Sequence, residues 1–326
     1  MTNWRPTSNA DVAARRAALL RRVRQYFDDQ QVLEVDTPAL SAAASSDVQL
    51  ESFEVSNSAS ATPLFLYTSP EFCMKRLLAA GYPDIYSICR VFRDAESGRH
   101  HQPEFTLLEW YRRDFDLNAI IADTLNVIAL ALEEPTFRES ATILDYRDAF
   151  AASVGIDPIS ASVSELADAA RADTSLREAL GDERDDWLDL LLTSKVAPTF
   201  AKNRLTVLRH YPASQAALAQ LCPADANVAD RFEIFKGPIE LANGYVELGN
   251  AAEQAERIAS EQWHRERRGR RQRPSDRNLV AALEAGLPSC SGVAVGIERL
   301  HMIHENTDDI RNVICFAFEG YDEQVT

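Results

Sequence analysis

The sequence predicts an α+β fold with a mostly antiparallel sheet flanked by helices. Strand-like and helical runs alternate along the chain without the regular βαβ order of a parallel sheet. Hydrophobic residues make up 46% of the 326 residues, which allows a sizeable core. Two strand-like runs, at residues 85–92 and 105–111, flank a charged, turn-rich loop at 94–102 and predict an antiparallel hairpin. The length of the chain allows one large domain or two small ones.

The part before this hairpin is expected to begin with a long helix over residues 11–29, because apolar residues such as Leu19 and Phe27 recur at helical spacing. A second helix is expected to start at Ser69 and Pro70, which suit the N-cap and the first helical position. The remaining elements expected here are a strand at residues 32–35, a loop at 41–46, a strand at 64–67 and a continuation of the second helix to residue 80.

The part after the hairpin is expected to be helical over residues 117–201, which are rich in Ala and Asp and carry little motif chemistry. Strands resume at residues 205–208 and alternate as far as Val246. The last expected elements are helices at residues 251–268 and 276–285, a strand at 292–297, a helix from 298 and a strand at 313–318.

Composition restricts the class of protein. The formal net charge is −16, which lowers the odds that nucleic acid is the main partner, because proteins that grip nucleic acid usually present a basic face. The chain has no apolar run near the roughly 20 residues of a membrane span and no signal-like N-terminus, so we expect a soluble, cytoplasmic protein without membrane contact. The five cysteines form no Cys-x-x-Cys pair and lie in apolar settings, so we expect buried free thiols and neither a disulfide framework nor a structural zinc site.

The predicted hairpin carries the first candidate site. Arg93 stands at the end of a strand, ahead of the charged loop, and Phe105 begins the returning strand. An arginine can bind an α-phosphate while an aromatic ring stacks on a base. From these residues alone, a surface hairpin with a solvated tip is an equally good interpretation.

The segment from Ser291 to Arg299 carries the second candidate site. Its glycines permit a ligand to approach a buried strand closely. Arg299, at the start of the following helix, could reach a γ-phosphate. The alternative is a tightly packed core strand with Arg299 in a structural ion pair.

Three acids spaced by seven residues, Glu233, Glu240 and Glu247, form the third candidate site. Seven is odd, so a regular strand would place Glu240 and Glu247 on opposite faces; a bulge at 243–244 would restore a common face. Apolar neighbours make an ordinary charged edge strand less favoured, because buried acids need partners. Carboxylates together with phosphates suit Mg²⁺.

These segments resemble the class II aminoacyl-tRNA synthetases, and the lysine-activating branch fits best. Residues 27–38 resemble motif 1, residues 91–105 motif 2 and residues 291–299 motif 3, so the resemblance covers nearly the whole chain. It implies that residues 1–326 form a single catalytic domain of this class. It implies a homodimer formed through motif 1 and the use of ATP with Mg²⁺. It also implies that Arg93 and Arg299 are catalytic and that Glu233 and Glu240 hold the metal.

The resemblance assigns further residues to the two substrates. Phe105 would stack on adenine, Glu71 would meet one amino group of the substrate, and Tyr111 and Glu247 would bind its terminal ammonium. The full ATP-binding set would be Arg93, Asp94, Ala95, Gln102, Phe105, Glu240, Leu241, Gly296 and Arg299. The amino-acid set would be Ser69, Pro70, Glu71, Tyr111, Asn243, Glu247 and Ala294.

In three features the chain resembles one subgroup, the stand-alone paralogues of the lysyl-tRNA synthetases. These paralogues activate (R)-β-lysine with ATP and transfer it to a lysine ε-amine of elongation factor P. Motif 1 begins within the first thirty residues, so no anticodon-binding domain and no stable tRNA binding are expected. Ala294 stands where lysyl-tRNA synthetases have glycine, and the run from Tyr211 to Gln215 resembles the paralogues. The alternatives are a minimal lysyl-tRNA synthetase-like enzyme, an ammonia-dependent asparagine synthetase, and a non-catalytic, synthetase-like regulatory subunit.

Some residues depart from the family pattern. Ala95 stands where the family has an acid, and Glu96 could substitute for that acid. Gln102 stands where Asn is usual, and Glu298 stands where Asp is usual. These changes bear on ATP affinity more than on substrate class. The basic stretch from residue 264 to 273 is expected to be a solvated helix end, with a docking patch as the less favoured interpretation.

Overall fold

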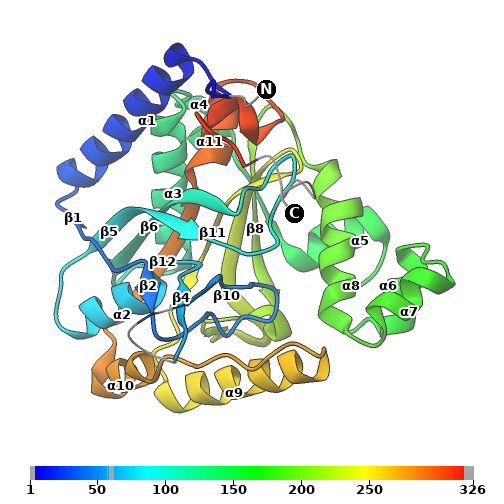
Figure 1. Cartoon of the computed structure of the whole chain (residues 1–326). Helices are drawn as coiled ribbons and strands as arrows, with labels where there is room; N and C mark the ends of the chain where they lie inside the picture. Colours follow the sequence, from blue (N-terminus) through cyan, green and yellow to red (C-terminus); the bar gives the residue numbers. More distant parts are fainter. Residues whose placement is uncertain (1–3, 57, 59–61, 319–326) are drawn as a thin grey trace.

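A computed structural model describes residues 4–56, 58 and 62–318, and it confirms the α+β class (Figure 1). A nine-stranded sheet has the order β1-β5-β6-β12-β11-β10-β8-β7, with β9 paired to β10. The β1–β5 and β7–β8 pairs are parallel and the other pairs of this sheet are antiparallel. The strands of this sheet are β1 Leu33–Glu34, β5 Ile85–Phe92, β6 Glu104–Arg113, β7 Thr142–Asp145, β8 Leu205–Pro212, β9 Leu221–Cys222, β10 Asp225–Lys236, β11 Ile239–Val246 and β12 Cys290–Gly296. A small second sheet has the order β2-β4-β3, with β2 Leu40–Ser41, β3 Glu54–Val55 and β4 Leu64–Leu66.

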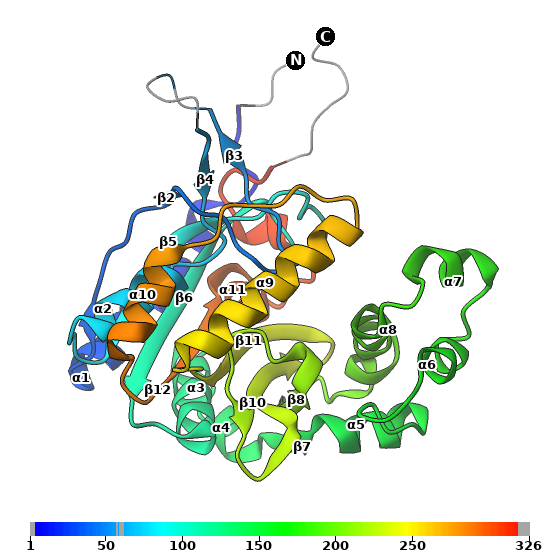
Figure 2. The same ribbon diagram turned by 90° about the horizontal axis from the view of Figure 1, so that it is seen from below.

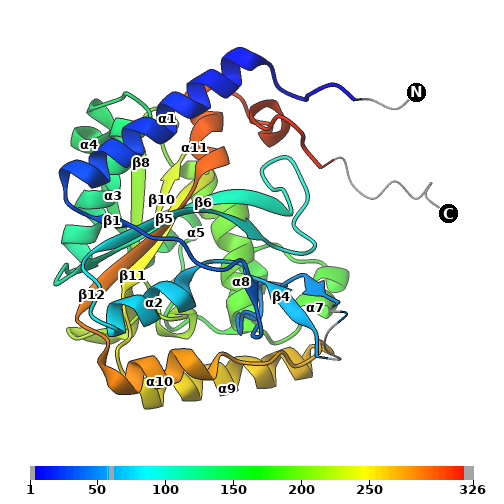
Figure 3. The ribbon, with the colours of Figure 1, turned by 60° about the vertical axis from the view of Figure 1, so that its left-hand side comes forward.

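Helices cover the sheet in three groups. The first comprises α1 Ala10–Asp29, α3 Leu117–Ala131, α4 Thr136–Ser140 and α11 Ile297–His304, which lie beside one another (Figures 1 and 3). The second is a lobe beside the β7–β8 edge, with α5 Tyr146–Val154, α6 Val163–Ala169, α7 Thr174–Leu180 and α8 Arg184–Leu191 (Figure 2). The third comprises α2 Glu71–Ala79, α9 Ala251–Arg267 and α10 Arg277–Gly286. Among the residues that the structure describes, no helix combines the length and the apolar character that a membrane span requires.

One face of the large sheet forms the main core. Leu108, Ala242, Val246, Val293 and Val295 pack there with buried residues of α1, α3 and α11. Side chains alternate along a strand, so the residues between these five point to the opposite face. The hydrophobic pattern therefore sets which residues of β6, β11 and β12 are left to form a site.

The register of β10 and β11 corrects the predicted bulge. The pairing steps from Ile234–Ala242 to Phe235–Glu240, so Leu241 is the extra residue. Residues 243–244 pair regularly with both neighbouring strands, so the predicted position was wrong. The predicted consequence holds, because the bulge lies between Glu240 and Glu247 and both residues reach the same cavity.

Three other predictions were wrong. Residues 117–201 are not helical throughout, because β7 lies among them and pairs with β8. The strand expected at residues 313–318 is absent from the described part of this segment. A 3₁₀ helix spans Ile310–Val313, and the backbone beyond it bonds to Thr7 and not to a sheet edge. The cysteines are all free as expected, but only Cys290 is buried, and Cys315 is exposed.

Candidate functional site

A single cavity of about 1230 Å³ collects most of the predicted site residues. It lies over the sheet face opposite the main core, and residues of α2 and α9 also line it. Three predicted residues, Pro70, Asp94 and Ala95, are not among its lining residues. The predicted residues that line it are Ser69, Glu71, Arg93, Gln102, Phe105, Tyr111, Glu233, Glu240, Leu241, Asn243, Glu247, Ala294, Gly296 and Arg299.

Cross-strand pairing arranges the cavity floor in rows. Ala294 on β12 pairs with Asn243 on β11 and with Glu109 on β6. One row further, Gly292 pairs with Tyr245 and with Tyr111. Antiparallel register therefore brings together residues that are separated by almost two hundred positions in the chain.

Gly292 is required for this packing. A Cβ atom there would lie 2.4 Å from Oε1 of Glu247 and 2.5 Å from Cε1 of Tyr111. Both distances are far below van der Waals contact, so any larger residue would displace these two side chains. At Gly296 a Cβ would meet only Arg299, at 3.9 Å, so protein atoms do not demand glycine at that position.

One end of the cavity holds a buried lysine between two predicted substrate-binding acids. Nζ of Lys75 lies 2.7 Å from Oε1 of Glu71 and 2.6 Å from Oε2 of Glu247. Lys75 and Glu247 are each only 1% exposed. Burial by itself would lower the pKa of Lys75, but Glu247 and Glu71 together outweigh it, so the pKa is raised and the lysine is an ammonium ion.

A third acid completes this cluster. Glu109 accepts hydrogen bonds from Oγ of Ser69, at 2.7 Å, and from the hydroxyl of Tyr111, at 2.8 Å. Burial, followed by the charge of Glu71, raises the pKa of Glu109 to about 7. Tyr111, predicted to contact a substrate ammonium directly, thus binds Glu109 in this structure.

This end of the cavity therefore has more carboxylate groups than cationic groups. Three carboxylates, of Glu71, Glu109 and Glu247, face the single ammonium of Lys75, and the hydroxyl of Tyr245 donates to Glu71 at 2.5 Å. Burial raises the pKa of Glu247 against the opposing effect of Lys75. An incoming ligand with two ammonium groups would balance the two carboxylates that Lys75 does not neutralise.

This excess of acid makes binding of a diamino substrate pH-dependent. Glu109 must be ionised to neutralise a cation fully, so KM for the diamino acid is expected to rise as pH falls through about 7. Binding near neutral pH is also expected to release protons. Calorimetry in buffers of different ionisation enthalpy measures this release, and Glu109→Gln should reduce it. If Glu109→Gln releases as many protons on binding as the parent chain, Glu109 is not the group that ionises when the diamino substrate binds.

The other end of the cavity carries the motif 2 residues. The guanidinium of Arg93 lies 5.0 Å from the centre of the Phe105 ring, and its Nη1 lies 3.6 Å from Oε1 of Glu96. Glu96 also lines the cavity, so an acid is present near the position where Ala95 lacks one. Gln102 is buried and its Oε1 accepts from the backbone N–H of Phe318, at 2.6 Å.

Arg299 enters this end from the first turn of α11. Its guanidinium donates to Oε2 of Glu240, at 3.2 Å, and to Nε2 of His101, at 2.6 Å. A guanidinium only donates hydrogen bonds, so Nε2 of His101 carries no proton. Burial, followed by the charge of Arg299, lowers the pKa of His101 and keeps the ring neutral.

Glu233 and Glu240 form an electrostatically strained pair of carboxylates. Burial, followed by the charge of Glu240, raises the pKa of Glu233 to about 7, although Arg231 donates to Glu233 at 2.7 Å. A divalent cation would relieve this repulsion, and carboxylate oxygens beside phosphates are the ligands that Mg²⁺ prefers. The carboxylate chemistry of the two predicted metal ligands thus fits the ion, while in this structure Arg231 and Arg299 pair with Glu233 and Glu240.

Sequence reasoning missed four residues of the site: Lys75, Glu109, Tyr245 and Gly292. Signals for two of them are present in the sequence. Lys75 follows Glu71 by four positions, so it lies on the same helix face, and Glu109 interrupts an apolar strand. Gly292 was considered only as one of the glycines that let a ligand approach the strand, and Tyr245 carries no local signal. The packing of Gly292 against Glu247 and Tyr111 and the hydrogen bond from Tyr245 to Glu71 depend on side chains that other elements supply.

The basic stretch at residues 264–273 is only in part a solvated helix end, because Arg267, Arg270 and Arg271 are exposed whereas other arginines of the stretch are buried or half-buried in ion pairs. Arg265 is buried and bonds to Glu51 at 2.7 Å, while Arg273 bonds to Glu54 at 2.8 Å. Arg268 contacts Asp186 of α8 at 3.0 Å. These arginines therefore fix the end of α9 to the segment around residues 47–54 and to the helical lobe.

Comparisons with known proteins agree with this geometry. A family model described as class II tRNA synthetases (D, K and N) matches residues 1–319. A curated elongation factor P–(R)-β-lysine ligase of Pseudoalteromonas translucida is 44% identical over 96% of this chain and 97% of its own. Ligases of the same name from Klebsiella pneumoniae, strain 342, and from Pectobacterium atrosepticum are 43% and 41% identical, over 97% and 98% of this chain and 98% of their own.

Proposed function

The chain belongs to the elongation factor P–(R)-β-lysine ligase family within the class II tRNA synthetases, and from this we propose that it activates (R)-β-lysine with ATP and transfers it to a lysine ε-amine of elongation factor P. The observation that carries the proposal is one cavity with two chemically distinct ends. An acidic end, with Glu71, Glu109 and Glu247, suits a diamino acid, and an end with Arg93 and Arg299 suits a polyphosphate.

In the first step, an oxygen of the substrate carboxylate attacks the α-phosphorus of ATP. A new P–O bond forms, the bond to the β-phosphate oxygen breaks, and pyrophosphate leaves with the electron pair. Arg93 and Arg299 would stabilise the charge that develops on the phosphates, and such preorganised electrostatics is usually a large part of catalysis. Mg²⁺, held by Glu233 and Glu240, would neutralise phosphate charge when bound.

In the second step, the acceptor ε-amine attacks the carbonyl of the mixed anhydride. An amide bond forms, the bond between the acyl carbon and the phosphate oxygen breaks, AMP leaves with the electron pair, and the attacking nitrogen loses one proton to solvent. The amine attacks only when it is deprotonated, so the acceptor lysine must reach the carbonyl in its neutral form.

A side-by-side transfer assay tests the proposal. Labelled α-lysine or (R)-β-lysine is offered with ATP, and either total tRNA or purified elongation factor P is the acceptor. We expect label from (R)-β-lysine on the factor and none on tRNA. Label on tRNA and none on the factor would instead establish a minimal lysyl-tRNA synthetase, and absence of ATP–pyrophosphate exchange would establish a non-catalytic protein.

Ala294 is proposed to discriminate between the two lysines. Its methyl group faces the cavity between Asn243 and Glu109, close to where the α-substituent of the substrate would lie. Ala294→Gly is expected to raise the ratio of kcat/KM for α-lysine to kcat/KM for (R)-β-lysine by about tenfold or more. This is the usual scale for one methylene in a pocket. Ala242→Gly, on the core face of β11, should leave that ratio unchanged. An unchanged ratio in Ala294→Gly would remove this role.

We also propose that the chain forms a homodimer through the motif 1 region. β1 is an edge strand of the large sheet, and Leu33 on it is 45% exposed. Leu33→Asp is expected to produce monomers, measured by sedimentation velocity. Ile143→Asp is the matched control, since Ile143 is 48% exposed on β7 at the other sheet edge. If both variants stay dimeric, the interface lies elsewhere.

A further inference from the structure

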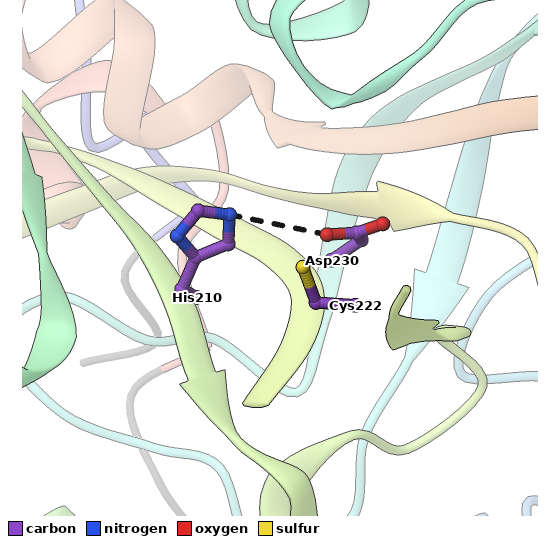
Figure 4. A group of neighbouring side chains, drawn as sticks. All are labelled: His210, Cys222 and Asp230. Atoms are coloured by element: carbon purple, nitrogen blue, oxygen red, sulfur yellow. Dashed lines mark ion pairs between the residues drawn. The ribbon is translucent and has the colours of Figure 1, made fainter. Parts of the chain in front are cut away.

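Three side chains with metal-binding atoms meet outside the cavity (Figure 4). They are His210 on β8, Cys222 on β9 and Asp230 on β10, and one ligand atom of each lies within 4.8 Å of the others. Asp230 is buried, and the other two are partly buried. The sequence contains no Cys-x-x-Cys pair, but here a single cysteine meets two ligands of other types.

The backbone of the neighbouring strands is irregular at this point. The pairing of β10 with β8 steps from Ala229–Tyr211 to Phe232–Arg209, so Asp230 and Arg231 both stand opposite His210. His210 has a φ of 57°, in the left-handed region that non-glycine residues rarely adopt. Local strain of this kind persists only where surrounding contacts hold it, and it is often found at functional sites.

Hydrogen bonds to other residues occupy Nδ1 of His210 and Oδ2 of Asp230. The remaining atoms, Nε2 of His210 and Oδ1 of Asp230, face each other. Nδ1 of His210 lies 3.1 Å from Oδ1 of Asp145, and Nε2 faces Oδ1 of Asp230 at 3.9 Å. The other oxygen of Asp230 accepts from Gln220 at 3.2 Å. A histidine that binds a metal commonly gives its second ring N–H to a carboxylate, as Asp145 provides here.

The distance between these two atoms suits a shared ion better than a direct contact. At 3.9 Å it is too long for a hydrogen bond. Two ligands on a tetrahedral zinc ion stand about 3.4 Å apart, given metal–ligand bonds of about 2.0–2.1 Å. Small side-chain rotations would therefore bring His210 and Asp230 to the distance of two zinc ligands.

We propose that His210, Cys222 and Asp230 bind one Zn²⁺ ion, with the fourth position open to water. A thiolate, an imidazole and a carboxylate together select zinc over Mg²⁺ or Ca²⁺, which take oxygen ligands. The site is distinct from the Glu233–Glu240 pair. The zinc ion would stabilise the irregular segment of β10 that carries Arg231. The guanidinium of Arg231 in turn donates to Glu233 in the cavity.

A second group of metal-binding side chains provides a matched control. His301, His304 and Glu305 also lie within 4.8 Å of one another. They all come from the end of one helix, and Arg15 occupies both oxygens of Glu305 at 2.5 and 2.6 Å. This carboxylate is already neutralised, so we expect no zinc there.

Cobalt substitution tests the proposal on the full chain. The protein is stripped with a chelator, desalted and titrated with Co²⁺, and zinc is counted separately by mass spectrometry after incubation and desalting. We expect one metal per chain and a thiolate-to-cobalt charge-transfer band with the intense visible bands of a tetrahedral site. Competition with Zn²⁺ should remove these bands.

Variants assign the ligands. Cys222→Ser should abolish the charge-transfer band, and His210→Gln should weaken metal binding at least tenfold. Asp145→Asn should weaken it about 10- to 100-fold, the usual effect of losing such a partner. Cys315→Ser and His304→Gln should bind as the parent chain does. Circular dichroism of each metal-free variant shows whether it is folded; Cys222 is only partly buried, so its variant is expected to fold.

Three outcomes would overturn the proposal. The first is the absence of stoichiometric metal. The second is a charge-transfer band that survives Cys222→Ser. The third is a loss of binding in His304→Gln equal to the loss in His210→Gln.

Discussion

Arg299→Ala is expected to lower the rate of ATP–pyrophosphate exchange by about 100- to 1000-fold, the scale seen when one preorganised donor to a developing charge is removed. Arg299 is held toward the phosphate end of the cavity by Glu240 and by the neutral ring of His101. Its side chain lies outside the hydrophobic core, where Leu300 and Met302 anchor the same helix. The variant should therefore keep the fold while losing charge stabilisation.

Two control variants separate the role of Arg299 from a general charge effect. Arg299→Lys keeps the positive charge but not the planar fork of donors, so it should retain an intermediate rate. Arg311→Ala removes an exposed arginine near the same end of the chain and should exchange normally. Exchange is measured beside the melting temperature of each variant. A near-normal rate in a folded Arg299→Ala protein would contradict the motif 3 assignment.

Local sequence patterns were sufficient for most elements of the fold. The hairpin of β5 and β6, the helix α1 and the strand β12 follow from apolar periodicity and turn residues, and they lie within a few residues of their predicted bounds. The bulge at Leu241 and the course of the chain after Val313 were missed. Both depend on pairing between strands or segments far apart in the sequence, and no local pattern encodes such pairing.

The same distinction explains what could be predicted of the site. Arg93, Phe105 and Arg299 belong to contiguous motifs, so the resemblance located them. Lys75 and Glu109 leave local signals in the sequence, but their shared role appears only in the fold, because β6, the end of β11 and α2 bring three carboxylates to one buried ammonium. The zinc ligands are similar, since they come from three strands and share no spacing that a sequence search would detect.

Glu247 is expected to be the main determinant of affinity for the diamino substrate. It is buried at the cavity wall, and Oε1 has no hydrogen-bond partner among the described residues, so an ammonium that reached this oxygen would satisfy it. Removing one partner of a buried charge pair typically costs about 2–5 kcal/mol, which corresponds to about 30-fold to several thousand-fold in KM. Glu247→Gln should raise KM for (R)-β-lysine by such a factor and change KM for ATP little.

Glu247→Gln also removes a partner of Lys75, so stability and binding must be separated. The single variant leaves Lys75 with Glu71 alone and should lower the melting temperature, because breaking a buried pair typically costs about 3–5 kcal/mol. Lys75→Met removes the internal cation and should destabilise the chain in the same way.

The double variant, with Lys75→Met and Glu247→Gln, removes both charges and should recover part of that stability, since the two residues are in direct contact. It should not recover affinity for (R)-β-lysine, because the carboxylate that binds the ammonium is still missing. Melting curves and isothermal titration on the three variants and the parent chain give both quantities. Recovery of substrate affinity in the double variant would show that Glu247 acts only on Lys75. A larger loss of ATP affinity than of amino-acid affinity in Glu247→Gln would place Glu247 at the nucleotide end.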